Sequence, residues 1–244
     1  MGAGARRVSL DENRAGGNVA WPRIESLPSP AAAAHVWWCP LRATPAEARA
    51  WDAVLSPAEQ TRATRFGTRL LRTRYVIGRT ALRRVLANVL GLQPAQVPII
   101  RGARGRPGLA GDPRIDFNVS HTGDVALIGV TDGGRVGVDV ERADRTINVD
   151  GISRKFLTDN ERALLAPMDA DAARRTVLTL WTCKEAMSKA TGDGLSAPFA
   201  RIDVDLHEGR ALRDGPGPYA PHDWALHAVQ VPDGHIATLA LWRR

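Results

Sequence analysis

The chain has 244 residues, of which 44% are hydrophobic and 24% are charged. This composition excludes a largely disordered chain, and it suffices for one large domain or two small ones with a substantial core. The formal net charge of +7 indicates an anionic partner, which can be a nucleic acid, an acidic protein or a polyphosphate ligand.

Two further features bear on the cellular compartment. No apolar run reaches the roughly 18 residues that a membrane helix needs, and the N-terminus lacks the apolar core of a signal peptide. Cys39 and Cys183 lie far apart and form no metal-type cluster. We therefore expect a cytoplasmic protein that binds no membrane, with both cysteines as buried free thiols; a disulfide between them remains open.

The first part of the chain predicts an extension, a strand and two helix starts. Residues 1–34 are rich in Gly, Ala, Pro and Arg without a sustained period, so we expect a flexible or surface-laid extension. Residues 35–41 favour a strand. Thr44 and Ser56 are each followed by Pro, and Glu59 lies three residues after Ser56 in capping-box spacing, which predicts two helices.

A longer helix is predicted from apolar residues at helical spacing between Leu71 and Val89, and Gly91 ends it. Arg79 and Arg83 lie on the opposite face. We interpret that face as solvated, because a helix commonly packs one side into a core and exposes the other.

Strand and helix patterns continue to the end of the chain. Residues 125–131 and 135–141 predict a β-hairpin, because Asp132-Gly133-Gly134 is a turn signal. The remaining expected elements are strands at 97–101, 114–120, 201–206, 224–231 and 235–242 and helices at 159–166 and 172–191. The order of elements predicts an α+β fold with two halves of similar make-up, residues 35–120 and 121–244.

The placement of lysine is unusual. Among 33 basic residues only Lys155, Lys184 and Lys189 are lysines, and two of them fall within six residues. Lysine is a compact charge that can change its protonation state, whereas arginine almost never does. The cluster indicates a site that needs an ammonium group, for example near phosphate, although three lysines are few enough to cluster by chance.

Asp139 and Glu141 are two apart in a predicted strand, so their side chains point to the same face, about 7 Å apart. Val136, Val138 and Val140 point the other way, into a core. Two carboxylates on one face repel each other unless a cation lies between them, and Mg²⁺ takes oxygen ligands of this kind. The alternative is a pair of exposed carboxylates at the end of a strand.

Glu185 and Lys189 are four residues apart on a predicted helix, and Trp181 lies one turn earlier on the same side. An exposed Glu–Lys pair of this spacing is an ordinary surface feature. An indole is rarely left on a purely solvated face, however, which favours a functional site. Ser120 and His121, at the end of a predicted strand, are weaker candidates for phosphate binding.

Taken in order, segments of the chain resemble the signatures of the 4′-phosphopantetheinyl transferase superfamily. Residues 105–107, Gly-Arg-Pro, with residues 117–121, Phe-Asn-Val-Ser-His, are similar to its first signature. Residues 137–141, Gly-Val-Asp-Val-Glu, are similar to its Gly-Ile/Val-Asp-x-Glu signature, and residues 181–192 to its Trp-x-x-Lys-Glu signature. The resemblance covers about residues 35–244, and the length resembles the monomeric surfactin-synthetase-activating type.

The resemblance implies a fold and a reaction. Such proteins have two α+β halves in a pseudo-twofold arrangement, with the active site between the halves. They move phosphopantetheine from coenzyme A to a serine hydroxyl of a carrier protein and release 3′,5′-adenosine bisphosphate. Carrier proteins are usually acidic, which fits the positive charge of this chain. We accordingly expect a monomeric transferase that binds no nucleic acid.

The resemblance also implies roles in catalysis. Asp139, Glu141 and Glu185 would hold Mg²⁺ or Mn²⁺ on the pyrophosphate. Glu185 is also the candidate base for the carrier serine, and Lys189 would stabilise the leaving phosphate. The expected catalytic residues are therefore Glu185, Lys189 and Asp139. Lys184 lies nearer the apolar side of the helix and would contact coenzyme A less directly.

Five further residues match family positions that bind coenzyme A: Arg62, Arg74, Arg106, Ser120 and His121. The first falls where the 3′-phosphate is held, the second near the adenosine, and the last three at the phosphates. The chain departs from the family at Glu59, where some members have a second basic residue for the 3′-phosphate. Arg65 and Arg69 are the candidates to replace it.

Two other functions stay open at this point. A non-catalytic basic module that binds RNA or an acidic protein would explain the charge and the arginine-rich helix. It gives no reason for the Asp-x-Glu strand, the third carboxylate and the clustered lysines, and RNA binding would favour more exposed aromatic residues. An inactive relative that only binds coenzyme A would not need the intact carboxylates. We therefore predict a Mg²⁺-dependent phosphopantetheinyl transferase.

Overall fold

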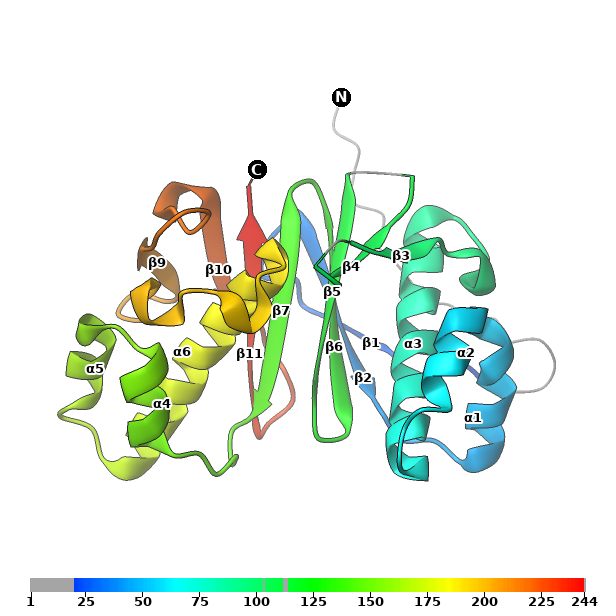
Figure 1. Cartoon of the computed structure of the whole chain (residues 1–244), viewed down its shortest axis with the longest axis horizontal. Coiled ribbons are helices and arrows are strands. Elements are labelled where there is room, and N and C mark those ends of the chain that lie inside the picture. Colours follow the sequence, from blue (N-terminus) through cyan, green and yellow to red (C-terminus); the bar gives the residue numbers. More distant parts are fainter. Residues whose placement is uncertain (1–19, 103, 112–113, 244) are drawn as a thin grey trace. The chain divides into compact units, whose positions relative to one another are not determined.

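The computed structural model describes residues 20–102, 104–111 and 114–243. Within these ranges the chain forms two compact units, whose helices and strands are labelled in Figure 1. The first unit consists of residues 20–25 and 39–98, and the second consists of residues 26–38 and 99–243.

The first unit is helical. Its elements are α1 (Pro45–Trp51), α2 (Pro57–Ala63) and α3 (Arg69–Leu90), with the 3₁₀ turns η1 (Asp52–Val54) and η2 (Pro94–Gln96). Thr44 and Ser56 cap α1 and α2, as the sequence predicts, and both helices have a complete capping box, which was predicted only for Ser56 with Glu59. Gly91 ends α3 in the left-handed conformation, with a φ of 68°, which glycine adopts without a steric penalty.

The basic face predicted for α3 is only partly solvated. Arg83 is 2% exposed, and its Nε donates to Glu59 at 2.6 Å while its Nη1 donates to the carbonyls of Pro94 and Val97. Arg79 donates to the other Glu59 oxygen at 2.8 Å. The solvated interpretation is wrong for Arg83, because a carboxylate from α2 neutralises its charge inside the unit.

The second unit contains two main sheets. One has the strand order β1 (Glu25–Leu27), β2 (Ala34–Pro40), β6 (Val125–Asp132) and β5 (Ile115–Thr122), and the other has the order β10 (Trp224–Ala228), β11 (His235–Trp242) and β7 (Arg135–Arg142). Two small ladders join β3 (Ile99–Arg101) with β4 (Pro107–Leu109) and β8 (Asp203–Asp205) with β9 (Ala211–Asp214). The pairs β5–β6 and β7–β11 are antiparallel.

The hairpin predicted from residues 125–131 and 135–141 is correct in its strands and wrong in its pairing. The turn exists, with φ values of 113° and 70° at Gly133 and Gly134. However, β6 pairs with β5 and β2, whereas β7 pairs with β11. A turn signal specifies that the chain reverses, but it does not specify which neighbour each strand bonds.

Side chains of β5 bond the edge of β7 that faces away from β11. Every second residue of β5 accepts a hydrogen bond from every second N–H of β7. The pairs are Asp116 with Val136 at 2.9 Å, Asn118 with Val138 at 3.1 Å and Ser120 with Val140 at 3.4 Å. We refer to Asp116, Asn118 and Ser120 as the β5 polar ladder. The ladder gives partners to backbone donors that an unpaired strand edge would leave unsatisfied.

Helices and 3₁₀ turns complete the second unit. They are α4 (Val149–Phe156), α5 (Asp159–Leu165), α6 (Ala170–Thr191), η3 (Gly194–Ser196), η4 (Phe199–Arg201) and η5 (Pro221–Asp223). Helix α6 packs on β7 and β11 (Figure 1). The approach is closest at Gly137, where an added Cβ would stand 1.8 Å from the carbonyl oxygen of Ala186. Only glycine permits this distance, so Gly137 determines where α6 lies on β7.

The hydrophobic core lies on both faces of the sheet that contains β7. On one face, the three valines of β7 are at most 1% exposed and pack with Leu127 and Leu239, as the strand alternation predicts. On the other face, Leu180 and Met187 of α6 belong to a second cluster. Both cysteines are buried and free, as expected.

The α+β class is confirmed, whereas the predicted domain division is not matched by the two compact units. Strand β5, from the predicted half 35–120, belongs to the second unit, and the similarity of the two halves stays a prediction. Of the extension predicted at residues 1–34, residues 1–19 lie outside the described residues, and Glu25–Leu27 form an edge strand that no sequence pattern indicated. None of the helices in the described ranges has the length and hydropathy that crossing a membrane would require.

We predict that Gly137→Ala lowers the free energy of unfolding by about 3 kcal/mol, because the added methyl group overlaps the Ala186 carbonyl and forces α6 to shift. Gly108→Ala is the matched control, since Gly108 also lies in a strand and a Cβ there meets no atom within 4 Å. Chemical denaturation of both variants measures the difference. Equal stability of the two variants would contradict the close packing of α6 on β7.

Candidate active site

The strand and the helix that the motifs single out meet in the structure. Lys189 of α6 donates from Nζ to Asp139 Oδ1 of β7 at 2.6 Å and to Ser120 Oγ of β5 at 2.9 Å. Ser120 in turn donates to Asp139 Oδ1 at 2.7 Å. Asp139 and Ser120 are both buried, so side chains from three elements form one interior cluster.

Glu141 lies two residues further along β7. Thr122 donates to its Oε2 at 3.2 Å, and Arg145 forms an ion pair with its Oε1. Burial raises the pKa of Glu141; Arg145 opposes this shift and the nearby Asp139 adds to it. Glu141 and His121 line the same cavity, which has a volume of about 510 Å³.

Glu185 is the third carboxylate of the cluster. It is half-buried on α6, and burial raises its pKa; Lys189 opposes the shift, whereas Asp139 and Glu141 add to it. The three carboxylates are therefore close enough to repel one another. Such repulsion favours the binding of a cation among them.

The oxygen donors of this cluster fit a hard divalent cation. Asp139 Oδ2 is buried without a hydrogen-bond partner, and a buried carboxylate oxygen normally has one. Mg²⁺ and Mn²⁺ both take carboxylate oxygens as ligands. Within the described ranges, no group of three or more His, Cys, Asp or Glu side chains is already arranged to hold a metal. Lys189 and Arg145 instead pair with Asp139 and Glu141.

Lys184 lies outside this cluster, which corrects the expectation that it contacts coenzyme A. Its side chain is fully buried, and its Nζ donates to Glu161 at 2.6 Å and to the carbonyls of Phe156 and Phe199 at 2.8 and 2.7 Å. An ammonium group has three donors, and all three are used. Lys184 therefore anchors α6 to the segments packed against it and has no donor left for a ligand.

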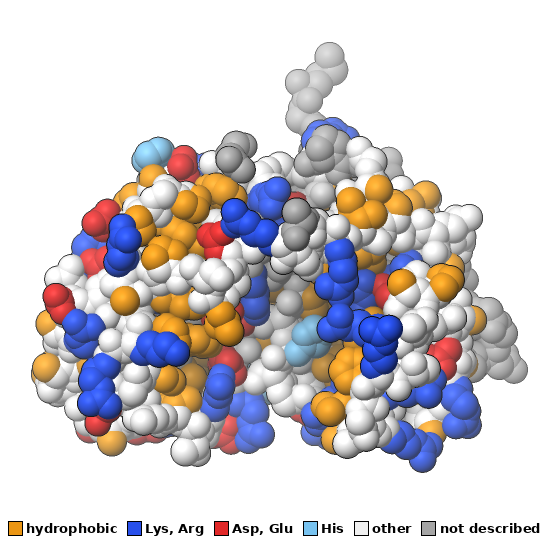
Figure 2. All heavy atoms as spheres, viewed as in Figure 1, with side chains coloured by type: hydrophobic (Ala, Val, Ile, Leu, Met, Phe, Trp, Pro, Cys, Tyr) orange, Lys and Arg blue, Asp and Glu red, His pale blue; other side chains and the backbone are white. Residues whose placement is uncertain are grey.

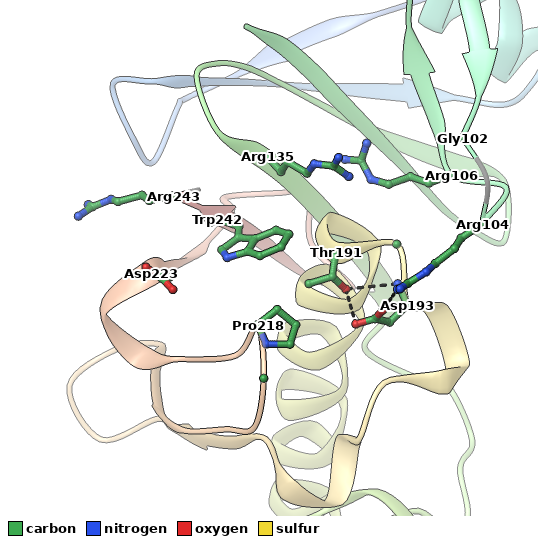
Figure 3. A pocket seen from close by; sticks show the side chains of 12 residues that line it. Gly102, Arg104, Arg106, Arg135, Thr191, Asp193, Pro218, Asp223, Trp242 and Arg243 are labelled. Atoms are coloured by element: carbon green, nitrogen blue, oxygen red, sulfur yellow. Dashed lines mark hydrogen bonds and ion pairs between the residues drawn. The ribbon is translucent and has the colours of Figure 1, made fainter. Parts of the chain in front are cut away.

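Arg106 is also engaged within the protein, and the phosphate contact expected of it stays a prediction. Its guanidinium forms a bidentate pair with Asp116 at 2.8 and 2.6 Å, and its Nε donates to the carbonyl of Lys189 at 2.7 Å. The side chain is 11% exposed. Figure 3 shows Arg106 beside Arg135 at the margin of a cavity of about 910 Å³, which Arg104, paired with Asp193, also lines.

Arg62 and Arg74 lie in the first unit, and their contact with coenzyme A stays a prediction. The Arg62 guanidinium lies 5.9 Å from the centre of the Tyr75 ring, and Tyr75 packs on Phe66 with 5.0 Å between ring centroids. Arg74 is half-buried, and its Nε is buried without a hydrogen-bond partner. Glu59, which stands where some family members have a second basic residue, is neutralised by two arginines of its own unit.

Sequence reasoning missed several residues around the cluster. Asp116 and Asn118 bond β7 together with Ser120, and polar residues at alternate positions of a strand were the signal that could have indicated one polar face. Thr122, the last residue of β5, bonds Glu141 and was not among the predicted site residues. Arg145 gave no signal, because an ion pair across a loop leaves no period in the sequence.

Comparison with known proteins identifies the family. Residues 135–240 match the sequence model of the 4′-phosphopantetheinyl transferase superfamily, and residues 38–132 match that of the 4′-phosphopantetheinyl transferase N-terminal region. The 4′-phosphopantetheinyl transferase HetI of Nostoc sp. is 31% identical over 85% of this chain and 86% of its own. The 4′-phosphopantetheinyl transferase Sfp of Bacillus subtilis is 26% identical over 74% of this chain and 73% of its own.

A crystal structure of a holo-(acyl-carrier-protein) synthase from Bacillus anthracis in complex with coenzyme A (3′,5′-ADP) matches 45% of this chain and 96% of its own, with a TM-score of 0.36 and 22% identity. The motif residues 137–141 and 181–192 lie within the matched range 135–240. From the two sequence models and the identity and coverage of the Nostoc relative, the chain belongs to the 4′-phosphopantetheinyl transferase superfamily.

Proposed function

We propose that this chain transfers the 4′-phosphopantetheine group from coenzyme A to a serine of an apo acyl or peptidyl carrier protein. One observation carries the proposal: the Lys189 ammonium contacts Asp139 within a cluster that holds two more carboxylates, Glu141 and Glu185. A transfer of this kind needs positioning and charge neutralisation more than covalent catalysis. Membership of the superfamily supports the same reaction class.

The proposed transfer forms one bond to phosphorus, breaks another and requires one proton acceptor. The serine oxygen forms a bond to the phosphorus that carries pantetheine, and the bond from that phosphorus to the bridging oxygen of the pyrophosphate breaks. The leaving group is 3′,5′-adenosine bisphosphate. Glu185 accepts the serine proton, directly or through water.

Asp139, Glu141 and Glu185 would hold Mg²⁺ or Mn²⁺. When bound, the metal would offset negative charge on the pyrophosphate. The buried, unpartnered Oδ2 of Asp139 supports this assignment. Lys189 would neutralise the leaving phosphate, since its side chain is 25% exposed and its ammonium already lies at the edge of the carboxylate cluster.

Further residues are proposed to bind coenzyme A. Arg62 would hold the 3′-phosphate, and Arg74 would contact the adenosine part. His121 is exposed in the cavity that it shares with Glu141, and it would contact the phosphates. The exposed Arg65 or Arg69 would supply the second basic contact to the 3′-phosphate.

The carrier protein is proposed to be acidic, and the enzyme is proposed to act as a monomer. The chain has a net charge of +7, and Figure 2 shows Lys and Arg side chains distributed across the displayed face. Opposite charge on the carrier would speed the encounter and make it sensitive to salt. A non-catalytic basic module has less support, because the buried carboxylates and Lys189 would have no role in it.

Intact-mass spectrometry of apo carrier proteins, incubated with this chain, coenzyme A and Mg²⁺, tests the proposed function. We expect a mass gain of one phosphopantetheine group, abolished by a metal chelator, because the carboxylates would need the cation to hold the pyrophosphate. A panel of fatty-acid, polyketide and nonribosomal-peptide carriers would identify the preferred partner. The absence of a gain on every carrier, with a known transferase modifying the same panel, would contradict the proposal.

We predict that Glu185→Gln lowers the transfer rate by about 100-fold or more, because the variant loses a metal ligand and the proton acceptor while keeping the size of the side chain. Glu208→Gln is the matched control, since Glu208 is exposed in the turn between β8 and β9. Initial rates in the mass assay measure both variants. Transfer at a near-normal rate by Glu185→Gln would refute the role assigned to Glu185.

A further inference from the structure

Arg106 lies at the junction of four elements. It directly precedes β4, and its guanidinium reaches β5 through Asp116, β7 through the carbonyl of Val136 at 2.9 Å and α6 through the carbonyl of Lys189 at 2.7 Å. A guanidinium has five N–H donors. These bonds, together with two longer ones to nearby carbonyls, engage each of its three nitrogens.

Asp116 of β5 bonds both Arg106 and β7. Its Oδ2 accepts hydrogen bonds from Arg106 at 2.6 Å and from the N–H of Val136 at 2.9 Å. Arg106 and Asp116 therefore bond the carbonyl and the amide of one β7 residue. The two side chains are 11% and 13% exposed, and a bidentate pair in such a setting has a fixed geometry.

The Lys189 carbonyl is one that its own helix cannot satisfy. Helix α6 ends at Thr191, and the last four carbonyls of a helix lack intrahelical partners. The next two backbone N–H groups after Thr191 both bond the carbonyl of Ser188, which leaves the Lys189 carbonyl to Arg106. A cation at this end also interacts favourably with the helix dipole.

We propose that Arg106 and Asp116 form a positioning pair for Lys189. The inference rests on the proposed function, in which Lys189 meets the leaving phosphate. Both members of the pair bond Val136 of β7, and Arg106 also bonds the Lys189 carbonyl in the last turn of α6. The pair therefore sets the separation between the Lys189 ammonium and Asp139. Neither Arg106 nor Asp116 touches the reacting atoms; both act through Lys189.

Direct contact between Arg106 and a phosphate is a different role, and the geometry disfavours it. The charge of Arg106 is compensated by Asp116, its nitrogens are engaged and its side chain is nearly buried. Arg135, which lies beside it in Figure 3, is exposed at the cavity margin. An anion entering this cavity would meet Arg135 before it met Arg106.

Arg106→Lys separates the two roles, because lysine keeps the charge but cannot form a bidentate pair and a third directed bond together. We expect kcat to fall by about 10-fold to 100-fold, as a slight misplacement of a catalytic group can cost that much. The KM for coenzyme A should change by less than about 2-fold, because ground-state binding is not removed. Asp116→Asn should give the same pattern.

Arg101→Lys is the matched control, since Arg101 is exposed on β3, the partner strand of β4, and its guanidinium donates to the Gly105 carbonyl. It should leave both constants unchanged. Because the pair acts as a unit, the double variant Arg106→Lys with Asp116→Asn should be as active as the less active of the two single variants. An unchanged kcat in Arg106→Lys, a raised KM with kcat kept, or additive losses in the double variant would each overturn the proposal.

Hydrogen exchange at the N–H groups of Gly192 and Asp193 gives a readout that does not depend on transfer. Both groups lie in the turn that Arg106 holds, and their exchange should be at least about 10-fold faster in Arg106→Lys and in Asp116→Asn than in the control. If the unaltered chain transfers nothing and these variants still exchange faster, the proposed function fails and the positioning pair stands. Unchanged exchange overturns the pair, whatever the activity.

Discussion

The close approach of α6 to β7 is the constraint on which the rest of the candidate site depends. The carbonyl of Ala186 lies where a Cβ of residue 137 would stand, so only glycine at that position permits the contact. Glu185 directly precedes Ala186, and Lys189 follows it within one helical turn. Strand alternation places Gly137 on the same face of β7 as Asp139 and the second carboxylate of that strand. One contact between a glycine and a helix carbonyl therefore brings both sets of charges together.

The two lysines of α6 differ in burial, and this difference gives one a structural role and the other a candidate catalytic role. Lys184 has a fully buried side chain that neutralises Glu161, and removal of either partner would leave an uncompensated charge in the core. Lys189 keeps 25% of its side chain exposed and shares Asp139 with Ser120. The first lysine fixes the helix against the rest of the unit, and the second can exchange part of its bonding for a ligand.

Local signals predicted those parts of the fold that a few neighbouring residues decide, such as the N-terminal caps of α1 and α2 and the buried valines of β7. Local signals did not predict the pairing of β7, because side chains of the β5 polar ladder bond the edge of β7 where a neighbouring strand would otherwise pair. In the site, the motifs singled out Asp139 and Lys189, which the structure brings together. The family resemblance assigned Lys184 and Arg106 to coenzyme A. The sequence does not show that each is paired with a carboxylate from another element, Glu161 and Asp116 respectively.

A crystal structure of the chain with coenzyme A and Mn²⁺ tests most directly whether the β7–α6 contact assembles a phosphopantetheinyl transfer site. The anomalous signal of manganese would locate the metal without reference to any other assignment. We expect manganese at Asp139 with Glu141 and Glu185, and the pyrophosphate of coenzyme A against the Lys189 ammonium. Manganese bound away from these carboxylates, or a pyrophosphate that does not reach Lys189, would contradict this expectation.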